Sequence, residues 1–193
     1  MINQSTLESY KSVEDLVERA KAFAKFAHAE AEQLRKYTDE PYIVHPEEVA
    51  RTIAKLKTTT PEMIAAAWLH DVVEDTRYTI ENIEYVFGEE VAGLVLMLTE
   101  FSTPEDGNRA ERKAIDRAYL ANVSPEAQTI KLADLIDNTQ SIFAHDKEFA
   151  KVYLKEKQEL LEVMNKGNKT LHRRAMKQVK DGLAELEKLN VGS

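Results

Sequence analysis

The stretch that decides the fold reads PEMIAAAWLHDVVEDT, residues 61–76. Its first half is apolar at helical spacing, and it begins with proline after a potential capping residue, Thr60. Its second half adds a histidine and three acids at the predicted end of that helix: His70, Asp71, Glu74 and Asp75. Burying one unpaired carboxylate costs several kcal/mol, so these groups need water, counter-charges or a metal ion.

The composition is that of an ordinary globular protein. The chain has 193 residues, of which 43% are hydrophobic and 31% charged, and this suits a single domain, residues 1–193, with a buried core. Cysteine is absent, so a metal ion would have to be held by histidine and carboxylate. The net charge of −8 argues against a nucleic-acid partner.

The sequence also predicts a cytoplasmic protein without a membrane partner. The most apolar runs, such as VAGLVLML at 91–98, fall well short of the roughly 18 residues that a spanning helix needs. The N-terminal residues show no basic stretch followed by an apolar one, which is the pattern of a signal peptide.

Helical periodicity runs through nearly the whole chain, and no segment alternates as a strand does. We therefore predict an all-α, single-domain bundle of unequal helices. His45 precedes Pro46, and the residue before proline avoids helical geometry, so we expect His45 at a helix cap. The predicted helices cover residues 11–35, 46–57, 61–75, 79–87, 89–99, 108–122, 125–143, 147–165 and 169–189.

A second acidic site lies in KLADLIDN, residues 131–138, where Asp134 and Asn138 share one side of a predicted helix. Taken alone, Asp134 could equally pair with Lys131. Together with His45 and the His-Asp pair at 70–71, however, it gives two imidazoles and two carboxylates. Such a mixed nitrogen and oxygen set suits Mn²⁺, Fe²⁺ or Zn²⁺ better than Ca²⁺ or Mg²⁺.

The remaining histidines favour structural interpretations. His145-Asp146 repeats the dipeptide without the downstream acids, which is typical of a surface or capping pair. His28 and His172 lie on predicted helices without acidic neighbours and are expected to be structural. The segment RAERK (109–113) is either a solvated helix face or a source of cations for substrate phosphates.

Four motifs give the chain a specific resemblance: YIVHPEEVA, AAAWLHDVVEDT, FGEEVAGLV and TIKLADLIDN. They occur in the order and spacing of the HD-domain hydrolases. More closely, residues from about 18 to about 165 resemble the RelA/SpoT-type alarmone hydrolases and their single-domain small relatives, including the metazoan SpoT homologue. The resemblance implies an HD-type multi-helix bundle, to which the predicted helix at 169–189 is added.

The resemblance also implies site residues. It implies one Mn²⁺ ion, with Fe²⁺ or Zn²⁺ as alternatives, held by His45, His70, Asp71 and Asp134. It implies that Glu74 and Asp75 are catalytic. It implies that Arg35, Lys36 and Asn138 bind the substrate. The RAERK segment adds Arg112 as a further expected substrate-binding residue. Glu32 stands where the family motif has glycine, and Leu135 and Asp137 replace a lysine and an aromatic residue.

The implied activity is metal-dependent removal of the 3′-pyrophosphate from guanosine tetra- and pentaphosphate, which leaves GDP or GTP. One alternative is a phosphohydrolase that acts at the same site on the 2′-phosphate of NADPH or on another nucleotide. Another alternative is a non-catalytic helical module that senses a nucleotide or binds a protein. The presence of both Glu74 and Asp75 favours an enzyme, because binding alone needs no proton-transfer pair.

Overall fold

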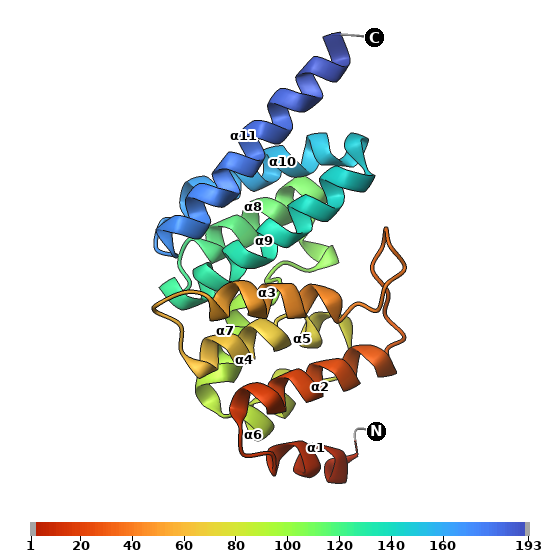
Figure 1. The fold of residues 1–193 in the computed structure, drawn as a ribbon, viewed down its shortest axis with the longest axis vertical. Helices are drawn as coiled ribbons and strands as arrows, with labels where there is room; N and C mark the ends of the chain where they lie inside the picture. The colour runs from red at the N-terminus through yellow and green to blue at the C-terminus, as the bar shows by residue number, and fades with distance from the viewer. Residues whose placement is uncertain (1–2, 192–193) are drawn as a thin grey trace. The chain divides into compact units, whose positions relative to one another are not determined.

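The structure is a computed structural model in which residues 3–191 are described. All its regular elements are helices (Figure 1), and the only β-type pairing within these residues is an isolated bridge between Leu34 and Pro41. This confirms the all-α prediction. Within the same residues, every helix is too short or too polar to cross a bilayer. The chain divides into two compact units, residues 1–99 and 100–193, and the single-domain assignment stays a prediction.

The first unit is built around α4 (Pro61–Leu69). Three consecutive alanines, Ala65, Ala66 and Ala67, have no exposed surface, and helices α2, α3 and α7 pack against α4. Thr60 caps its first turn by accepting the amide of Met63, as the sequence predicts. The other helices of this unit are α1 (Gln4–Lys11), α2 (Leu16–Glu30), α3 (Val44–Ala54), α5 (Val72–Asp75), α6 (Ile80–Phe87) and α7 (Glu89–Leu98).

The helix predicted over residues 61–75 is interrupted, because α4 ends at Leu69 and α5 begins at Val72. The ring nitrogen Nδ1 of His70 lies 2.8 Å from the carbonyl oxygen of Ala67. That carbonyl would accept the amide of Asp71 in an unbroken helix. A side-chain bond therefore competes with the backbone ladder, and the chain turns at His70 and Asp71.

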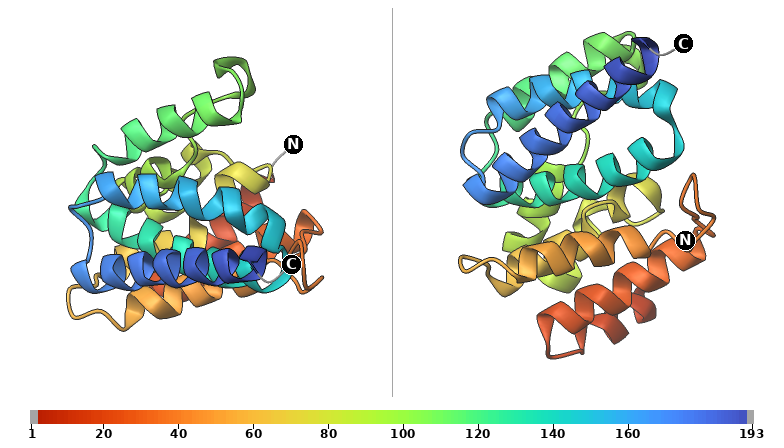
Figure 2. Two further views of the ribbon diagram at one scale, coloured as in Figure 1. Left: turned by 90° about the horizontal axis from the view of Figure 1, so that it is seen from above. Right: turned by 45° about the horizontal axis from the view of Figure 1, so that its top comes forward.

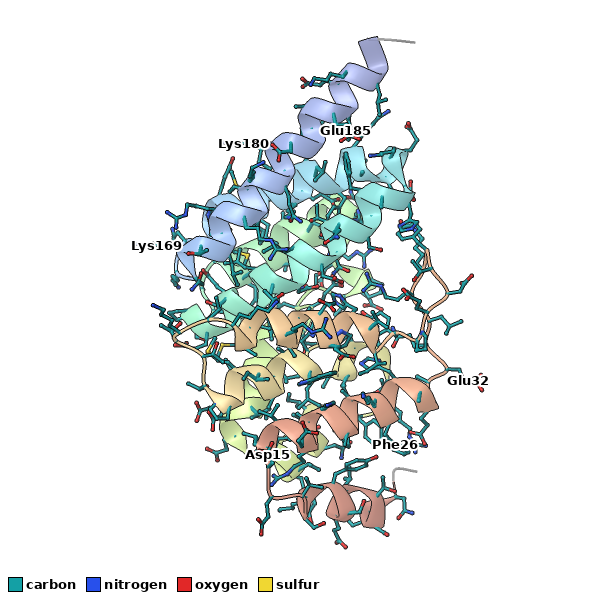
Figure 3. All side chains as sticks on the ribbon, in the orientation of Figure 1. Asp15, Phe26, Glu32, Lys169, Lys180 and Glu185 are labelled. Atoms are coloured by element: carbon teal, nitrogen blue, oxygen red, sulfur yellow. The ribbon has the colours of Figure 1, made fainter. Side chains whose placement is uncertain are left out.

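The N-terminal prediction also needs correction, because α1 was not predicted and α2 is shorter than the predicted helix 11–35. Asp15 lies at the start of α2 (Figure 3). It caps the helix by accepting the amide of Glu18 at 2.8 Å. The end of α2 is a Schellman motif, in which the amides of Glu32 and Gln33 donate to the carbonyls of Ala29 and His28, both at 3.1 Å.

Glu32, which follows the end of α2 (Figure 3), occupies the left-handed position of this motif. Its φ is 50°. Glycine takes this conformation without steric strain, whereas a side chain with a Cβ atom does not. The glycine of the family motif is thus replaced at a position that demands glycine geometry.

The expected place of His45 at a cap is wrong by two residues. Helix α3 begins at Val44 with Ile43 as its N-cap, so His45 lies inside the first turn, where its amide donates to the carbonyl of Tyr42 at 3.0 Å. Pro46 is tolerated there because the first amides of a helix have no helical acceptor. His45 is buried, with only 1% of its surface exposed.

The second unit contains the longer helices. Helices α10 and α11 form an antiparallel hairpin (Figure 2), and α9 packs against both. Asp146 caps α10 by accepting the amide of Phe149, and His145 is exposed, which confirms the capping interpretation of that pair. The elements of this unit are η1 (Pro104–Asp106), α8 (Arg109–Leu120), α9 (Pro125–His145), α10 (Lys147–Val163) and α11 (Lys169–Val191).

A buried lysine joins three helices of the second unit. Lys157 on α10 is 2% exposed and donates to the carbonyl of Leu135, the hydroxyl of Thr139 and the side-chain carbonyl of Gln178, at 3.2, 2.5 and 3.1 Å. Burial lowers the pKa of Lys157 to about 7; Asp134 opposes this shift and Arg174 adds to it.

The lowered pKa of Lys157 predicts a pH-dependent stability. Above pH 7 the native state loses a proton that the unfolded chain keeps until about pH 10, so unfolding takes up a proton and its free energy rises with pH. Between pH 7 and pH 9 we expect the parent to gain about 2 kcal/mol from this group. Urea unfolding should show that Lys157→Met lacks the gain and that Lys155→Met, an exposed change on the same helix, keeps it. An identical pH profile for the parent and Lys157→Met would contradict the assignment.

Glu32→Gly is expected to stabilise the protein by about 1 kcal/mol, because glycine relieves the strain of the left-handed residue. Ala31→Gly serves as the matched control. Ala31 has ordinary right-handed geometry with φ of −80°, so its replacement should lower the stability. Thermal or urea unfolding measures both changes, and a loss of stability in Glu32→Gly would be the wrong sign.

Candidate metal centre

Two imidazoles of the first unit face each other. The Nε2 atoms of His45 on α3 and His70 at the end of α4 lie 3.3 Å apart, and both side chains are at most 2% exposed. Because His70 donates from Nδ1 to the carbonyl of Ala67, its Nε2 carries a lone pair. The same hydrogen bond therefore both orients this ring and fixes its tautomer.

Asp71 completes a group of three ligand atoms. Its Oδ2 lies 3.0 Å from Nε2 of His70 and 3.6 Å from Nε2 of His45, and it accepts the hydroxyl of Tyr42 at 2.6 Å. The three atoms lie within 4.8 Å of one another. They fit a divalent transition ion, because a lone-pair nitrogen and a carboxylate oxygen converge in a buried place and an outer hydrogen bond orients the carboxylate. The structure thus brings together three of the four predicted ligands.

The predicted catalytic pair follows directly on α5. Glu74 and Asp75 are exposed, and Oδ2 of Asp75 accepts the side-chain amide of Gln33 at 2.8 Å. Partial burial raises the pKa of Asp75, and the hydrogen bond from Gln33 opposes that shift. Sequence reasoning missed Gln33 and Tyr42 as neighbours of the site. Gln33 lies in QLRK (33–36) and Tyr42 in the PY turn (41–42) before the HP motif, and these positions could have indicated that both lie near the site.

Arg35 and Lys36 lie on the loop between α2 and α3. The amide of Arg35 donates to the carbonyl of Glu40 at 2.8 Å, and the amide of Tyr42 donates to the carbonyl of Gln33 at 3.0 Å. These backbone bonds close the loop at its base. The ammonium group of Lys36 lies 4.9 Å from the ring centre of Tyr37. The role of both cations in substrate binding stays a prediction.

Asp134 and Asn138 lie on α9 in the second unit. The carboxylate of Asp134 is 2.8 Å from the ammonium of Lys131 and accepts the side-chain amide of Asn138 at 2.6 Å. The pairing with Lys131 considered from sequence is therefore present, and Asn138 shares the face of Asp134 as predicted. The place of Asp134 in the metal site and that of Asn138 in the substrate site stay predictions.

The RAERK segment lines a polar cavity of about 200 Å³ in the second unit, together with Glu100, Ser102 and Asp116. Arg109 is bound through two hydrogen bonds to Glu156, and Lys113 pairs with Glu100. Nε of Arg112, by contrast, is buried without a hydrogen-bond partner. An unmet donor on a cation beside a cavity favours anion binding over a purely solvated helix face.

The geometry predicts that divalent ions stabilise the protein. At a hundredfold excess over the dissociation constant, an ion bound only by the native state adds about 2.7 kcal/mol. Mn²⁺ or Zn²⁺ should therefore raise the Tm of the parent. The His70→Gln variant should lose the rise, and His145→Gln, which changes an exposed histidine, should keep it. Thermal unfolding with equilibrium dialysis measures this, and a parent that binds neither ion would contradict the metal site.

Comparison with known proteins places this geometry in a family. Residues 20–163 match the family model described as HD domain. A guanosine-3′,5′-bis(diphosphate) 3′-pyrophosphohydrolase of Aquifex aeolicus is 35% identical over 157 residues, which cover 81% of this chain and 22% of that protein. The guanosine-3′,5′-bis(diphosphate) 3′-pyrophosphohydrolase MESH1 of Drosophila melanogaster is 38% identical over 122 residues, 62% of this chain and 65% of that protein.

A solved structure gives the same result for the fold. It is described as a metazoan orthologue of SpoT that hydrolyses ppGpp, and it matches with a TM-score of 0.77 and 27% identity over 86% of this chain and 94% of that one. The chain spans 22% and 65% of the lengths of the two relatives named above. Because the HD-domain match covers well over half of the chain, the protein belongs to the HD-domain family.

Proposed function

We propose that the protein removes the 3′-pyrophosphate from guanosine 3′,5′-bis(diphosphate) and its pentaphosphate analogue, leaving GDP or GTP. The observation that carries the proposal is the convergence of His45, His70 and Asp71 beside the acidic pair Glu74 and Asp75. A relative whose name states this activity is 35% identical to the chain over 81% of the chain's length. The partner is thus a small nucleotide, and the proposed location is the cytoplasm.

The proposed cofactor is one Mn²⁺ ion, with Fe²⁺ and Zn²⁺ as alternatives for the same donor set. His45, His70 and Asp71 would hold it, and Asp134 is proposed as the fourth ligand on the basis of the family resemblance. When bound there, such an ion would supply Lewis-acid activation of water and of the phosphoryl group. Tyr42 supports this site by donating to Asp71, which fixes the direction of the carboxylate.

Glu74 and Asp75 are proposed to take the proton from the attacking water and return it to the leaving group. Both lie on α5, a single short helix directly after the ligand Asp71, and both are exposed to solvent. Carboxylates at this position can act as general acid and base towards a bound substrate. Asp75 is held from one side by Gln33, so its second oxygen faces away from that bond.

Cations are proposed to neutralise the phosphates of the substrate in this otherwise acidic protein. Arg112 has the strongest support, because its buried Nε lacks a protein acceptor beside a cavity. Arg35 and Lys36 are proposed to contact the nucleotide from the loop before α3, and Asn138 to contact it from α9. Guanidinium groups bind phosphate oxygens in pairs, which suits a substrate with two diphosphates.

The function predicts a defined product. With Mn²⁺, the parent should convert guanosine tetraphosphate to GDP and pyrophosphate, measured by chromatography of nucleotides and a pyrophosphate assay. Glu74→Gln should lower kcat by about a hundredfold or more while still binding nucleotide, because it removes a proton-transfer group. Glu81→Gln, an exposed change on α6, is the control and should leave kcat unchanged.

The same assay separates the competing functions. Release of phosphate from NADPH with no turnover of the alarmones would replace the proposal by another nucleotide phosphohydrolase. Binding of an alarmone without any hydrolysis by the parent would identify a sensor. Hydrolysis by Glu74→Gln at the parental rate would contradict the catalytic assignment of Glu74.

A further inference from the structure

A buried histidine, His28, has a ring nitrogen without a hydrogen-bond partner and is connected to Asp75 through Gln33. His28, in the last turn of α2, has 1% of its surface exposed, and from the sequence it was expected to be structural. Its Nδ1 lies 2.7 Å from Oε1 of Gln33, whereas its Nε2 is buried without a hydrogen-bond partner. A buried polar atom without a partner costs free energy, so its persistence calls for an explanation.

The direction of each hydrogen bond in this group is determined. Oδ2 of Asp75 can only accept, so the bond of 2.8 Å from Gln33 uses the amide Nε2–H of that residue. The carbonyl end of the same amide then faces His28, whose Nδ1 must be the donor. Nε2 of His28 therefore keeps its lone pair. Protonation would bury an N–H group with no acceptor, and burial accordingly lowers the pKa of His28.

The backbone fixes Gln33 over His28. The Schellman motif brings the amide of Gln33 back to the carbonyl of His28 at 3.1 Å, so the two residues are joined by a main-chain bond and a side-chain bond. The amide of Gln33 cannot turn over without placing its oxygen against the carboxylate of Asp75. Asp75 thus determines which end of the amide it meets, and His28 holds the other end through its Nδ1–H group.

The same group borders the candidate metal ligands. The ring of Tyr42 lies 4.9 Å from that of His28, measured between ring centres, and the hydroxyl of Tyr42 donates to Asp71. Main-chain pairing of Tyr42 with Gln33 at 3.0 Å joins the two neighbours of the acids. The support of Asp71 and that of Asp75 are therefore parts of one connected structure.

We infer that His28 is a positioning residue that acts through Gln33: the chain of bonds from His28 to Gln33 to Asp75 sets the direction of the Asp75 carboxylate and leaves its second oxygen available for proton transfer. The inference rests on the proposed function, because it gives a role to an acid of that site. A histidine that merely fills the core would need neither the fixed amide nor the bond to Asp75.

The first test needs no substrate. The protein is labelled with ¹⁵N-histidine and ¹³C-aspartate and loaded with Zn²⁺, which is diamagnetic. His28 should be a neutral Nδ1–H tautomer, with His145 and His172 as internal references. Gln33→Leu should remove the protected Nδ1–H signal and raise the pKa of Asp75, since a donor to the carboxylate is lost. Gln33→Glu should keep the acceptor for His28 while also raising the pKa of Asp75.

The second test separates positioning from packing. His28→Leu removes the donor, whereas His28→Asn offers an N–H near the place of Nδ1 and should restore most of the parental behaviour. For alarmone hydrolysis, Gln33→Leu and His28→Leu should lower kcat about tenfold with KM nearly unchanged, because the substrate contacts remain. The acidic limb of the pH–rate profile should move to higher pH in both variants. Gln140→Leu, an exposed change on α9, is the control.

The outcomes are distinguishable. An Nε2–H tautomer of His28, or a pKa of Asp75 that is the same in Gln33→Leu as in the parent, would overturn the inference whether or not the protein turns over alarmones. Parental kcat in Gln33→Leu would overturn it as well. Absence of alarmone turnover by the parent would instead overturn the proposed function, and the magnetic resonance readouts would still decide the role of His28.

Discussion

The bond from the ring of His70 to the carbonyl of Ala67 is the constraint on which the site depends. It competes for a backbone acceptor that the helix would otherwise use, and α4 ends at Leu69, with two residues between it and the start of α5. The same bond leaves Nε2 of His70 as a lone-pair donor that faces His45. Without the break, Asp71 would continue the line of α4. With it, one oxygen of Asp71 lies within 3.6 Å of both imidazoles.

The two acids next to this break are each held by one neighbouring side chain. Tyr42 holds Asp71 and Gln33 holds Asp75, and a main-chain bond joins Tyr42 to Gln33. Each acid therefore has a neutral donor that fixes its direction without cancelling its charge. This matters for the proposed roles of Asp71 as a ligand and Asp75 as a proton carrier, since a cationic partner would compete with a metal ion for the same oxygens.

The sequence predicted the helical class and the ligand motifs because both depend on local spacing. The Thr60-Pro61 start of α4 is one such local signal, and the His-Asp pair at 70–71 is another. The break after Leu69 was not predictable, because it arises from a side chain that captures a backbone carbonyl. The hydrogen bond between Gln33 and His28 could not be predicted from the sequence for a different reason. The Schellman motif that brings Gln33 back to His28 has Glu32 at the left-handed position, where glycine normally indicates such a motif. From the sequence, Lys157 would be expected on the surface. It is buried because α9 and α11 pack around it.

The loop between α2 and α3 is closed at its base by two features, the bridge between Leu34 and Pro41 and the main-chain bond from Tyr42 to Gln33. The residues between these pairs, 35–40, form a loop that these contacts hold at its base, and they include Arg35 and Lys36. Insertions, deletions and substitutions at the tip can therefore accumulate without strain reaching Asp71 or Asp75. Under the proposed function, residues of this loop that contact the nucleotide can change during evolution without altering the site around Asp71 and Asp75, so substrate preference and catalysis would be separately mutable.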